Sequence, residues 1–347
     1  GDVVMMKTAL CDMLGIKYPI IQAAMGPLNT KKLATAVSNA GGMGTLSIYH
    51  MTAEPSYAYK VYSDNIKYIT ENSRNNFACN MPIGAQIGER AVKTTDAYLK
   101  AVVDARKDPK VAKRLRLLIT SAGNPERYLE IINKERKNGM LHFHVVGSVR
   151  QAKKIESMGL DGVIASGFEM GGHTHRPPNV IHTFVLVPSV VDAVKIPVIA
   201  SGGVCDAKTY VASLAMGAIG AQMATRFIAT QECDFHDNYK QTVIDCKEYG
   251  DTLCPGAYSY LRVIKTEGAL KAIEMELSGK YSHEQMVDIA DEKMIIAEQD
   301  GDVVKGECPA GQCSSRVNDK PTVKEIIEKI MKESEKIIGN LVKLKSK

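Results

Sequence analysis

A histidine in a setting suited to acid–base chemistry lies in a glycine-rich stretch of the sequence. Residues 166–175 read Ser-Gly-Phe-Glu-Met-Gly-Gly-His-Thr-His, so His173 directly follows Gly171 and Gly172. Histidine titrates near neutral pH and can act there as an acid, a base or a hydrogen-bond donor. A lone histidine is more often structural, and the residue types by themselves leave both interpretations open.

Two turns of small residues have the composition of a phosphate site. Gly202 and Gly203 follow the apolar run Ile196–Ala200, and a Gln-Met-Ala-Thr sequence, residues 222–225, ends the next run. Free N–H groups at the start of a helix point toward an anion, glycine allows close approach of the backbone, and threonine adds a hydroxyl donor. Either turn alone could be a plain strand-to-helix connection. Together they predict bound phosphate.

Small and polar residues end two earlier apolar runs. Ala23, Ala24 and Met25 follow the first run and are mostly small enough to let a flat ring lie against the backbone. Asn80 ends the third run with a polar amide. If the runs are parallel strands, these positions share one edge of the sheet with the glycine turns, which predicts one site there.

The elements that must position these residues alternate along the chain. Apolar runs, each followed by a segment of helical spacing, predict a parallel sheet covered by helices. Eight such units close a (β/α)8 TIM barrel. An open doubly wound sheet is the alternative, but the early G-x-G-x-x-G loop typical of that fold is absent from the sequence. The predicted strands are Pro19–Ala24, Gly42–Leu46, Phe77–Met81, Leu115–Thr120, Leu141–Val146, Gly162–Ser166, Ile196–Ala200 and Gly220–Met223.

We therefore expect three segments. Residues 1–230 form the barrel, and residues 231–310 form a helical insertion after the eighth strand that covers the barrel mouth or mediates dimerisation. Within the insertion, helical spacing predicts Ala269–Leu277 and His283–Ala297. Residues 311–347 end in an amphipathic helix docked on the barrel, and Thr322 and Glu325 have the capping-box spacing that starts it.

Composition narrows the class of protein. With 45% hydrophobic and 24% charged residues, a disordered or collagen-like chain is excluded. The net charge of +5 comes mostly from residues 320–347, which hold eight Lys against four Glu, so we expect no nucleic-acid partner. No apolar run has the length of a membrane span, and the first residues lack the layout of a secretory signal, so we expect a cytoplasmic protein without a membrane partner.

The cysteines predict reduced thiols rather than a metal centre. Eight Cys are scattered along the chain, and no Cys-x-x-Cys motif occurs. His173 with His175, or Cys308 with Cys313, are conceivable metal ligands, but they lack the paired short loops of structural zinc sites. We expect no bound metal.

Several short motifs, in this order and spacing, resemble the nitronate monooxygenase family, formerly called 2-nitropropane dioxygenases. That family also contains the FMN-dependent enoyl-ACP reductase II enzymes. The motifs span nearly the whole chain and include Tyr-Pro-Ile-Ile-Gln-Ala-Ala-Met at 18–25, Ser-Asn-Ala-Gly-Gly-Met-Gly at 38–44 and Glu-Met-Gly-Gly-His at 169–173. Further matches lie at 196–203, 222–227 and 310–312.

The resemblance implies a (β/α)8 barrel with an added helical domain and non-covalently bound FMN. By position, it implies that Ala23, Ala24 and Met25 run along the isoalloxazine, that Asn80 contacts the ring system or ribityl chain, and that His173 is the active-site histidine. The other implied contacts are Gly171 and Gly172 beside the flavin, and Gly202, Gly203, Gln222, Met223, Ala224 and Thr225 around its phosphate.

The chain departs from the family pattern at three places. Ala224 stands where the family usually has glycine, and its methyl is tolerated if that residue has a negative φ. Ser166, which we include among the FMN contacts, stands where relatives carry Gln or Glu. Arg176 lies in a stiff polar loop, residues 175–178, that either positions an anionic or phosphorylated substrate or is simply solvated.

Two chemistries fit a histidine beside a flavin. In the first, an alkyl nitronate is oxidised with O2. In the second, NADH or NADPH reduces the flavin, which then reduces an enoyl thioester or a quinone; Gly123-Asn124-Pro125 is reminiscent of the enoyl reductases. A non-catalytic flavin- or phosphate-binding barrel is a third interpretation. We expect the first chemistry, a small-molecule substrate and a homodimer.

Overall fold

The structure is a computed structural model that describes residues 6–256 and 259–344. Within these residues, eight strands form one parallel sheet in the order β1-β9-β8-β6-β5-β4-β3-β2. A parallel bridge between Ile21 and Met43 links the two outer strands, so the sheet closes into a barrel as predicted. The strands are β1 (Ile20–Gln22), β2 (Gly44–Leu46), β3 (Phe77–Pro82), β4 (Leu115–Ser121), β5 (Leu141–Val146), β6 (Gly162–Ser166), β8 (Val198–Ser201) and β9 (Ala221–Met223).

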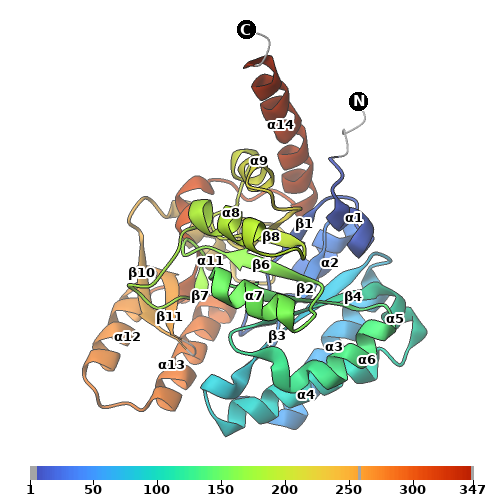
Figure 1. The fold of residues 1–347 in the computed structure, drawn as a ribbon. Helices are drawn as coiled ribbons and strands as arrows, with labels where there is room; N and C mark the ends of the chain where they lie inside the picture. The colour runs from blue at the N-terminus through green and yellow to red at the C-terminus, as the bar shows by residue number, and fades with distance from the viewer. Residues whose placement is uncertain (1–5, 257–258, 345–347) are drawn as a thin grey trace.

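Helices surround the barrel and connect consecutive strands (Figure 1). Their apolar faces pack on the outside of the sheet, because a strand buried on both faces needs a helix to cover it. The helices of this layer are α2 (Lys31–Asn39), α3 (Pro55–Asn72), α4 (Glu89–Ala105), α5 (Pro109–Arg114), α6 (Leu129–Lys137), α7 (Val149–Ser157), α8 (Thr183–Ala193), α9 (Ala207–Ala215) and the short α10 (Thr225–Ile228).

A separate helix closes the N-terminal end of the barrel. Leu10 and Leu14 of α1 (Ala9–Leu14) are fully buried, and they belong to the same apolar cluster as Ile21, Phe143 and other barrel residues. Side chains of α1 therefore fill the end of the barrel where the strands begin, and the opposite end, where the strands finish, is left for a site.

The described residues of the predicted insertion, 231–256 and 259–310, follow β9 and are drawn from gold to deep orange in Figure 1. Helices α12 (Glu267–Leu277) and α13 (His283–Ile295) lie where helical spacing predicts them, and α11 (Asp237–Asp245) precedes them. The sequence analysis missed an antiparallel hairpin in this segment, formed by β10 (Asp251–Pro255) and β11 (Tyr260–Ile264). The insertion is thus not helical throughout.

The hairpin belongs to a second, smaller sheet. β11 pairs with β12 (Cys308–Pro309) and also with β7 (Gly172–Thr174), a strand that comes from the loop after β6. A strand from a loop of the barrel therefore forms part of the sheet of the insertion.

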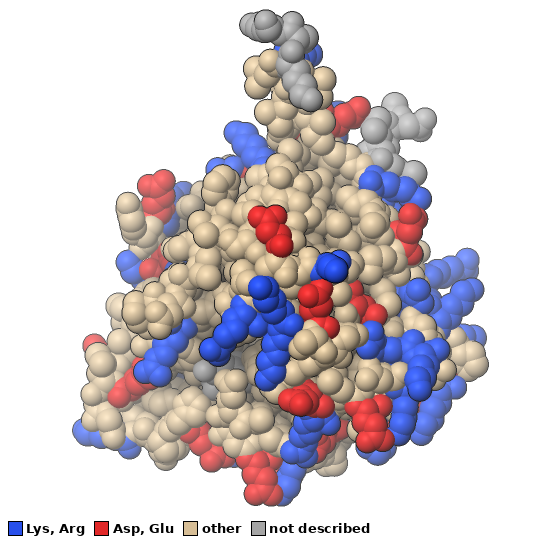
Figure 2. Space-filling view, in the orientation of Figure 1, with Lys and Arg blue, Asp and Glu red and all other residues tan. Residues whose placement is uncertain are grey.

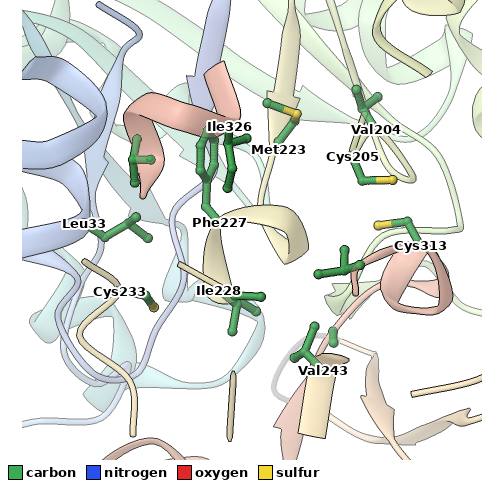
Figure 3. Close-up of a cluster of buried hydrophobic side chains, with 14 of the residues drawn as sticks. Leu33, Val204, Cys205, Met223, Phe227, Ile228, Cys233, Val243, Cys313 and Ile326 are labelled. Carbon is green, nitrogen blue, oxygen red and sulfur yellow. The ribbon is translucent and has the colours of Figure 1, made fainter. Parts of the chain in front are cut away.

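The last helix, α14 (Val323–Lys343), packs against the barrel helices α2 and α10. Its side chains Ile326, Ile327 and Ile330 are buried in a cluster that also contains Leu33 of α2 and Phe227 of α10. Figure 3 shows part of this cluster, with the sulfur atoms of Cys205 and Cys313 pointing toward each other at its edge. The far end of α14 projects beyond the rest of the molecule (Figure 1).

Candidate active site

A cavity of about 750 Å³ lies at the C-terminal ends of the barrel strands. Turns after the strands form its wall, and residues of the insertion complete it. Every site residue predicted from the sequence lines this one cavity: Ala23, Ala24, Met25, Asn80, Ser166, Gly171, Gly172, His173, Gly202, Gly203, Gln222, Met223, Ala224 and Thr225.

The turn after β8 requires its two glycines. Gly202 and Gly203 have φ values of 91° and 77°, in the left-handed region that disfavours L side chains. A Cβ atom on Gly202 would also lie 2.7 Å from the carbonyl oxygen of Gly167. The Ser201 hydroxyl donates to Oε1 of Gln222 over 3.3 Å and thereby holds this turn beside the end of β9.

The turn after β9 accommodates alanine in place of the family glycine. Ala224 has a φ of −119°, so its methyl group causes no backbone strain. The hydroxyl oxygen of Thr225 accepts a hydrogen bond from the Gly311 N–H over 2.9 Å. Its own hydrogen can still be donated, as the predicted phosphate contact requires.

His173 is held by the insertion as well as by the barrel. It lies on β7, where it is in register with Leu261 of β11. Burial lowers the pKa of its imidazole below the ordinary 6.5, and the negative charge of Asp291 opposes that shift. The shift favours the neutral imidazole, which can accept a proton or share a hydrogen bond in the cavity.

The segment before His173 is fixed by a residue that the sequence analysis missed. Arg262 of β11 is 3% exposed, and its guanidinium donates to the carbonyl oxygens of Met170 (3.1 Å) and Phe168 (2.9 Å). It also pairs with Asp251 on β10. The sequence analysis did not predict β11, so nothing in it indicated that Arg262 holds the backbone of the segment before His173.

His175 lines the cavity, and its ring packs between Ser166 and Gly147. Its Nε2 lies 3.3 Å from the carbonyl oxygen of Ser166. The ring occupies the space above Gly147, where an added Cβ would lie 1.9 Å from Nε2. Burial lowers the pKa of this histidine too.

Gln22 closes the barrel directly below the Ala23–Met25 wall. Its side-chain amide donates to the Thr45 carbonyl oxygen, and its Oε1 accepts from the Thr45 N–H, both over 3.1 Å. This pair of bonds joins β1 to β2 where only one backbone bridge links them. Asn80 donates to the Ile119 carbonyl oxygen over 3.2 Å, which holds its amide at the cavity wall.

Within residues 6–256 and 259–344, no group of three His, Cys, Asp or Glu side chains is placed to hold a metal ion, and the eight Cys are free and buried. In the same part of the chain, no helix has the length and apolar character needed to cross a bilayer.

Comparison with known proteins assigns the family. The sequence model of the nitronate monooxygenase family matches residues 7–333. A probable nitronate monooxygenase of Staphylococcus aureus is 30% identical over 279 residues, which are 73% of this chain and 76% of that protein.

Two solved structures share the fold. FabK from Thermotoga maritima is 30% identical, with a TM-score of 0.82 over 97% of this chain and 99% of its own. A nitroalkane oxidase from Streptomyces ansochromogenes is 24% identical, with a TM-score of 0.77 over 96% of this chain and 100% of its own. With the barrel, the cavity and the family match together, the chain belongs to the nitronate monooxygenase family and is an oxidoreductase.

Proposed function

We propose that the protein is an FMN-dependent oxidoreductase that oxidises alkyl nitronates with O2. One observation carries the proposal: a single cavity brings together the glycine turn after β8, the turn after β9 and the imidazole of His173. The matches to nitronate monooxygenases over most of the chain support the same reaction.

The residues that line the cavity fit a flavin mononucleotide. β8 and β9 are neighbours, so their two turns lie side by side and could hold one phosphate between them. The wall formed by Ala23 and Ala24 is small and apolar enough for a flat ring. A Cβ atom added to Gly172 would meet no protein atom within 4 Å, so open space lies beside the glycines expected to border the ring.

When bound, FMN supplies the electron transfer to O2; the protein supplies orientation and proton handling. His173 would donate an imidazole N–H to an oxygen of the bound nitronate or, where the neutral nitroalkane enters first, take its α-proton to give that nitronate. Its burial favours the neutral imidazole that both roles use. Arg262 positions this histidine indirectly, because it fixes the backbone of Phe168 and Met170 just before β7.

The test uses the purified flavin-loaded protein without oxygen. Propyl-2-nitronate is expected to bleach the flavin absorbance, and His173→Ala is expected to retain FMN while the rate falls by about 10²–10⁴-fold. Gln86, another polar residue that lines the cavity, serves as a control, and Gln86→Ala is expected to keep most of the rate. Flavin that nitronate leaves oxidised would overturn the proposal, and so would unchanged turnover in His173→Ala.

A second candidate is an NADH- or NADPH-dependent reductase of enoyl thioesters or quinones. The observation that favours it is the likeness to FabK, which extends over 97% of this chain at 30% identity. The same anaerobic experiment separates the two, because fast flavin reduction by NADH or NADPH and none by nitronate would select the reductase.

A further inference from the structure

Two cysteine thiols face each other at the border of the cavity. Cys205 lies in the turn after β8, and Cys313 lies in the short helix η4 (Gln312–Arg316), which follows β12. Their sulfur atoms point toward each other (Figure 3), although the two residues are 108 positions apart in the sequence (313 − 205 = 108). The site described above gives neither thiol a role.

The helix η4 supplies a cation as well as a thiol. The guanidinium of Arg316 pairs with the carboxylate of Asp206, which is the N-cap of α9 and the neighbour of Cys205 in the chain. Lys and Arg side chains are spread among Asp and Glu over the face shown in Figure 2, so a cation near a thiol means little by itself. Here, however, the ion pair holds the guanidinium beside Cys205, and it comes from the same short helix as Cys313.

These surroundings favour the thiolate of Cys205. Its pKa is lowered from the ordinary 9.0, first by a hydrogen bond with the Cys313 thiol and also by the guanidinium of Arg316, whereas burial and the charge of Asp206 oppose the shift. The other seven thiols of the chain, all within the described residues, have raised pKa values. Because the thiolate is the nucleophilic form, Cys205 is the cysteine best prepared to attack an oxidant.

The thiol pair can be reached from the cavity. Cys313 lines the cavity, and so does Val204, the residue before Cys205. Hydrogen peroxide is a small neutral molecule, so it can approach the two sulfur atoms from this side although both cysteines are buried.

We propose that Cys205 and Cys313 are a redox-active dithiol, which hydrogen peroxide oxidises to a disulfide that ties the turn after β8 to η4. The Cys205 thiolate attacks one peroxide oxygen, an S–O bond forms as the O–O bond breaks, and the released hydroxide takes up the proton that Cys205 lost. The Cys313 sulfur then gives up its proton and attacks the Cys205 sulfur. The S–S bond forms, the S–O bond breaks, and the second hydroxide takes up that proton. Two thiols and one peroxide thus give one disulfide and two water molecules.

The disulfide would join two parts of the wall around the expected flavin phosphate. Cys205 ends the glycine turn after β8, and the N–H of Gly311, two residues before Cys313, donates to the Thr225 hydroxyl in the turn after β9 over 2.9 Å. A covalent bond between these parts hinders this end of the cavity from opening, so bound FMN is expected to leave more slowly. This effect on FMN rests on the proposed function, whereas formation of the disulfide does not.

The experiment counts thiols and measures mass in the flavin-loaded full chain. Protein reduced with dithiothreitol and then freed of it is treated with hydrogen peroxide and denatured. The eight thiols are expected to fall to six (8 − 2 = 6), the mass is expected to fall by about 2 Da, and a peptide pair linked through Cys205 and Cys313 is expected after digestion. Dithiothreitol is expected to reverse these changes. Eight remaining thiols, or a disulfide between other cysteines, would overturn the proposal.

Three serine variants assign the roles within the pair. Cys205→Ser is expected to keep its remaining thiols, whereas Cys313→Ser is expected to stop at a sulfenic acid on Cys205 that dimedone traps. Cys233→Ser is the matched control, because Cys233 lies in the same apolar cluster but burial raises its pKa to about 12. It is expected to lose two thiols, as the original protein does. Equal thiol loss in Cys205→Ser and Cys233→Ser would contradict the assigned pair.

Arg316→Gln tests the pair with both cysteines in place. Arg316 is exposed, so its replacement leaves the apolar cluster intact and gives a result even where a serine variant does not fold. Disulfide formation is expected to slow by about tenfold, because the cation that favours the Cys205 thiolate is removed. An unchanged rate would contradict the role given to Arg316.

Release of FMN is measured by its fluorescence after dilution of the reduced and the oxidised protein. Release is expected to be about tenfold slower from the disulfide form and to recover with dithiothreitol. Equal rates would overturn the assigned consequence of the disulfide. A chain that binds no FMN would instead refute the proposed function, while the thiol count on the same sample tests the disulfide separately.

Discussion

Burial lowers the pKa of His173, and the direction of that shift predicts a pH profile. Its pKa is lowered from 6.5, and Asp291 partly opposes the shift. If the neutral imidazole is the active form, kcat/KM for nitronate falls on the acid side with an apparent pKa below 6.5. Asp291→Asn removes a charge that favours the imidazolium and moves this limb to lower pH. Rate measurements between pH 5 and 8 test both statements, and a limb above 6.5 would contradict them.

Gly147 leaves no room for a side chain unless the ring of His175 moves. An added Cβ would lie 1.9 Å from Nε2 of His175, so Gly147→Ala must displace the ring from the Ser166 carbonyl oxygen. We expect the free energy of unfolding to fall by about 1–3 kcal/mol, as measured by urea denaturation.

Gly339→Ala in α14 is the control for that substitution. Its added Cβ meets nothing within 4 Å, and the position lies inside a helix, where alanine is favoured over glycine by about 0.5–1 kcal/mol. A gain in stability is therefore expected at Gly339. A loss at both positions, or at neither, would contradict the assigned role of Gly147.

At the scale of the element, the last helix has a cap that can be tested. The Thr322 hydroxyl accepts from the Glu325 N–H over 3.2 Å, and the Glu325 carboxylate accepts from the Thr322 N–H over 2.8 Å. Thr322→Ala is expected to lower the free energy of unfolding by about 1 kcal/mol. Thr322→Ser retains the hydroxyl and is expected to keep most of that stability in the same urea titration.

The barrel elements could be predicted because their signals are local. Each barrel strand is a short apolar run followed by a helix of regular spacing, and the capping box of α14 lies within four residues. The positions of Gly202, Gly203 and Thr225 at strand ends follow from the same alternation. This is why the predicted residues line one cavity.

The way the missed hairpin joins the barrel depends on contacts between distant parts of the chain. Besides its hairpin partner β10, β11 pairs with β7 and β12, and Leu261 pairs with His173 across 88 positions (261 − 173 = 88). The Tyr-Leu-Arg-Val-Ile run at 260–264 has the β-branched and aromatic content of a strand, and it follows the turn dipeptide Pro255-Gly256, so the sequence did carry a signal of the hairpin. Nothing local indicates that Arg262 holds the backbone before His173.

For the whole molecule, the buried carboxyl of Glu307 predicts a stability that depends on pH. Burial raises its pKa to about 8, although the charge of Lys293 opposes the shift. The folded state binds the proton of the Glu307 carboxyl more tightly than the unfolded state does. The stabilisation that this proton contributes is therefore fully present below pH 4.5 and is lost as the pH rises through about 8. Glu307→Gln is expected to lack that loss and to be more stable than the original protein at pH 9.

Urea denaturation at pH 5 and pH 9 measures the difference. Glu333→Gln serves as the control, because Glu333 is exposed on α14 and is expected to leave the pH dependence unchanged. The same decline with pH in Glu307→Gln as in the original protein would contradict the assignment.

The expected homodimer remains a prediction. The outer end of α14 projects beyond the body of the molecule (Figure 1), and the side chains of Leu341 and Val342 are exposed. Sedimentation velocity of the full chain measures the assembly directly.

The pairing of β7 with β11 has a consequence for how this architecture can be altered. The imidazole of His173 belongs to a strand of the second, smaller sheet, whereas the turns expected to bind the flavin belong to the barrel. Exchange of residues 231–310 for the equivalent part of a relative would therefore replace β11, the strand that holds β7 and His173 in position. Such chimaeras would change which reactant the protein prefers, while the turns expected to hold the flavin phosphate stay unchanged.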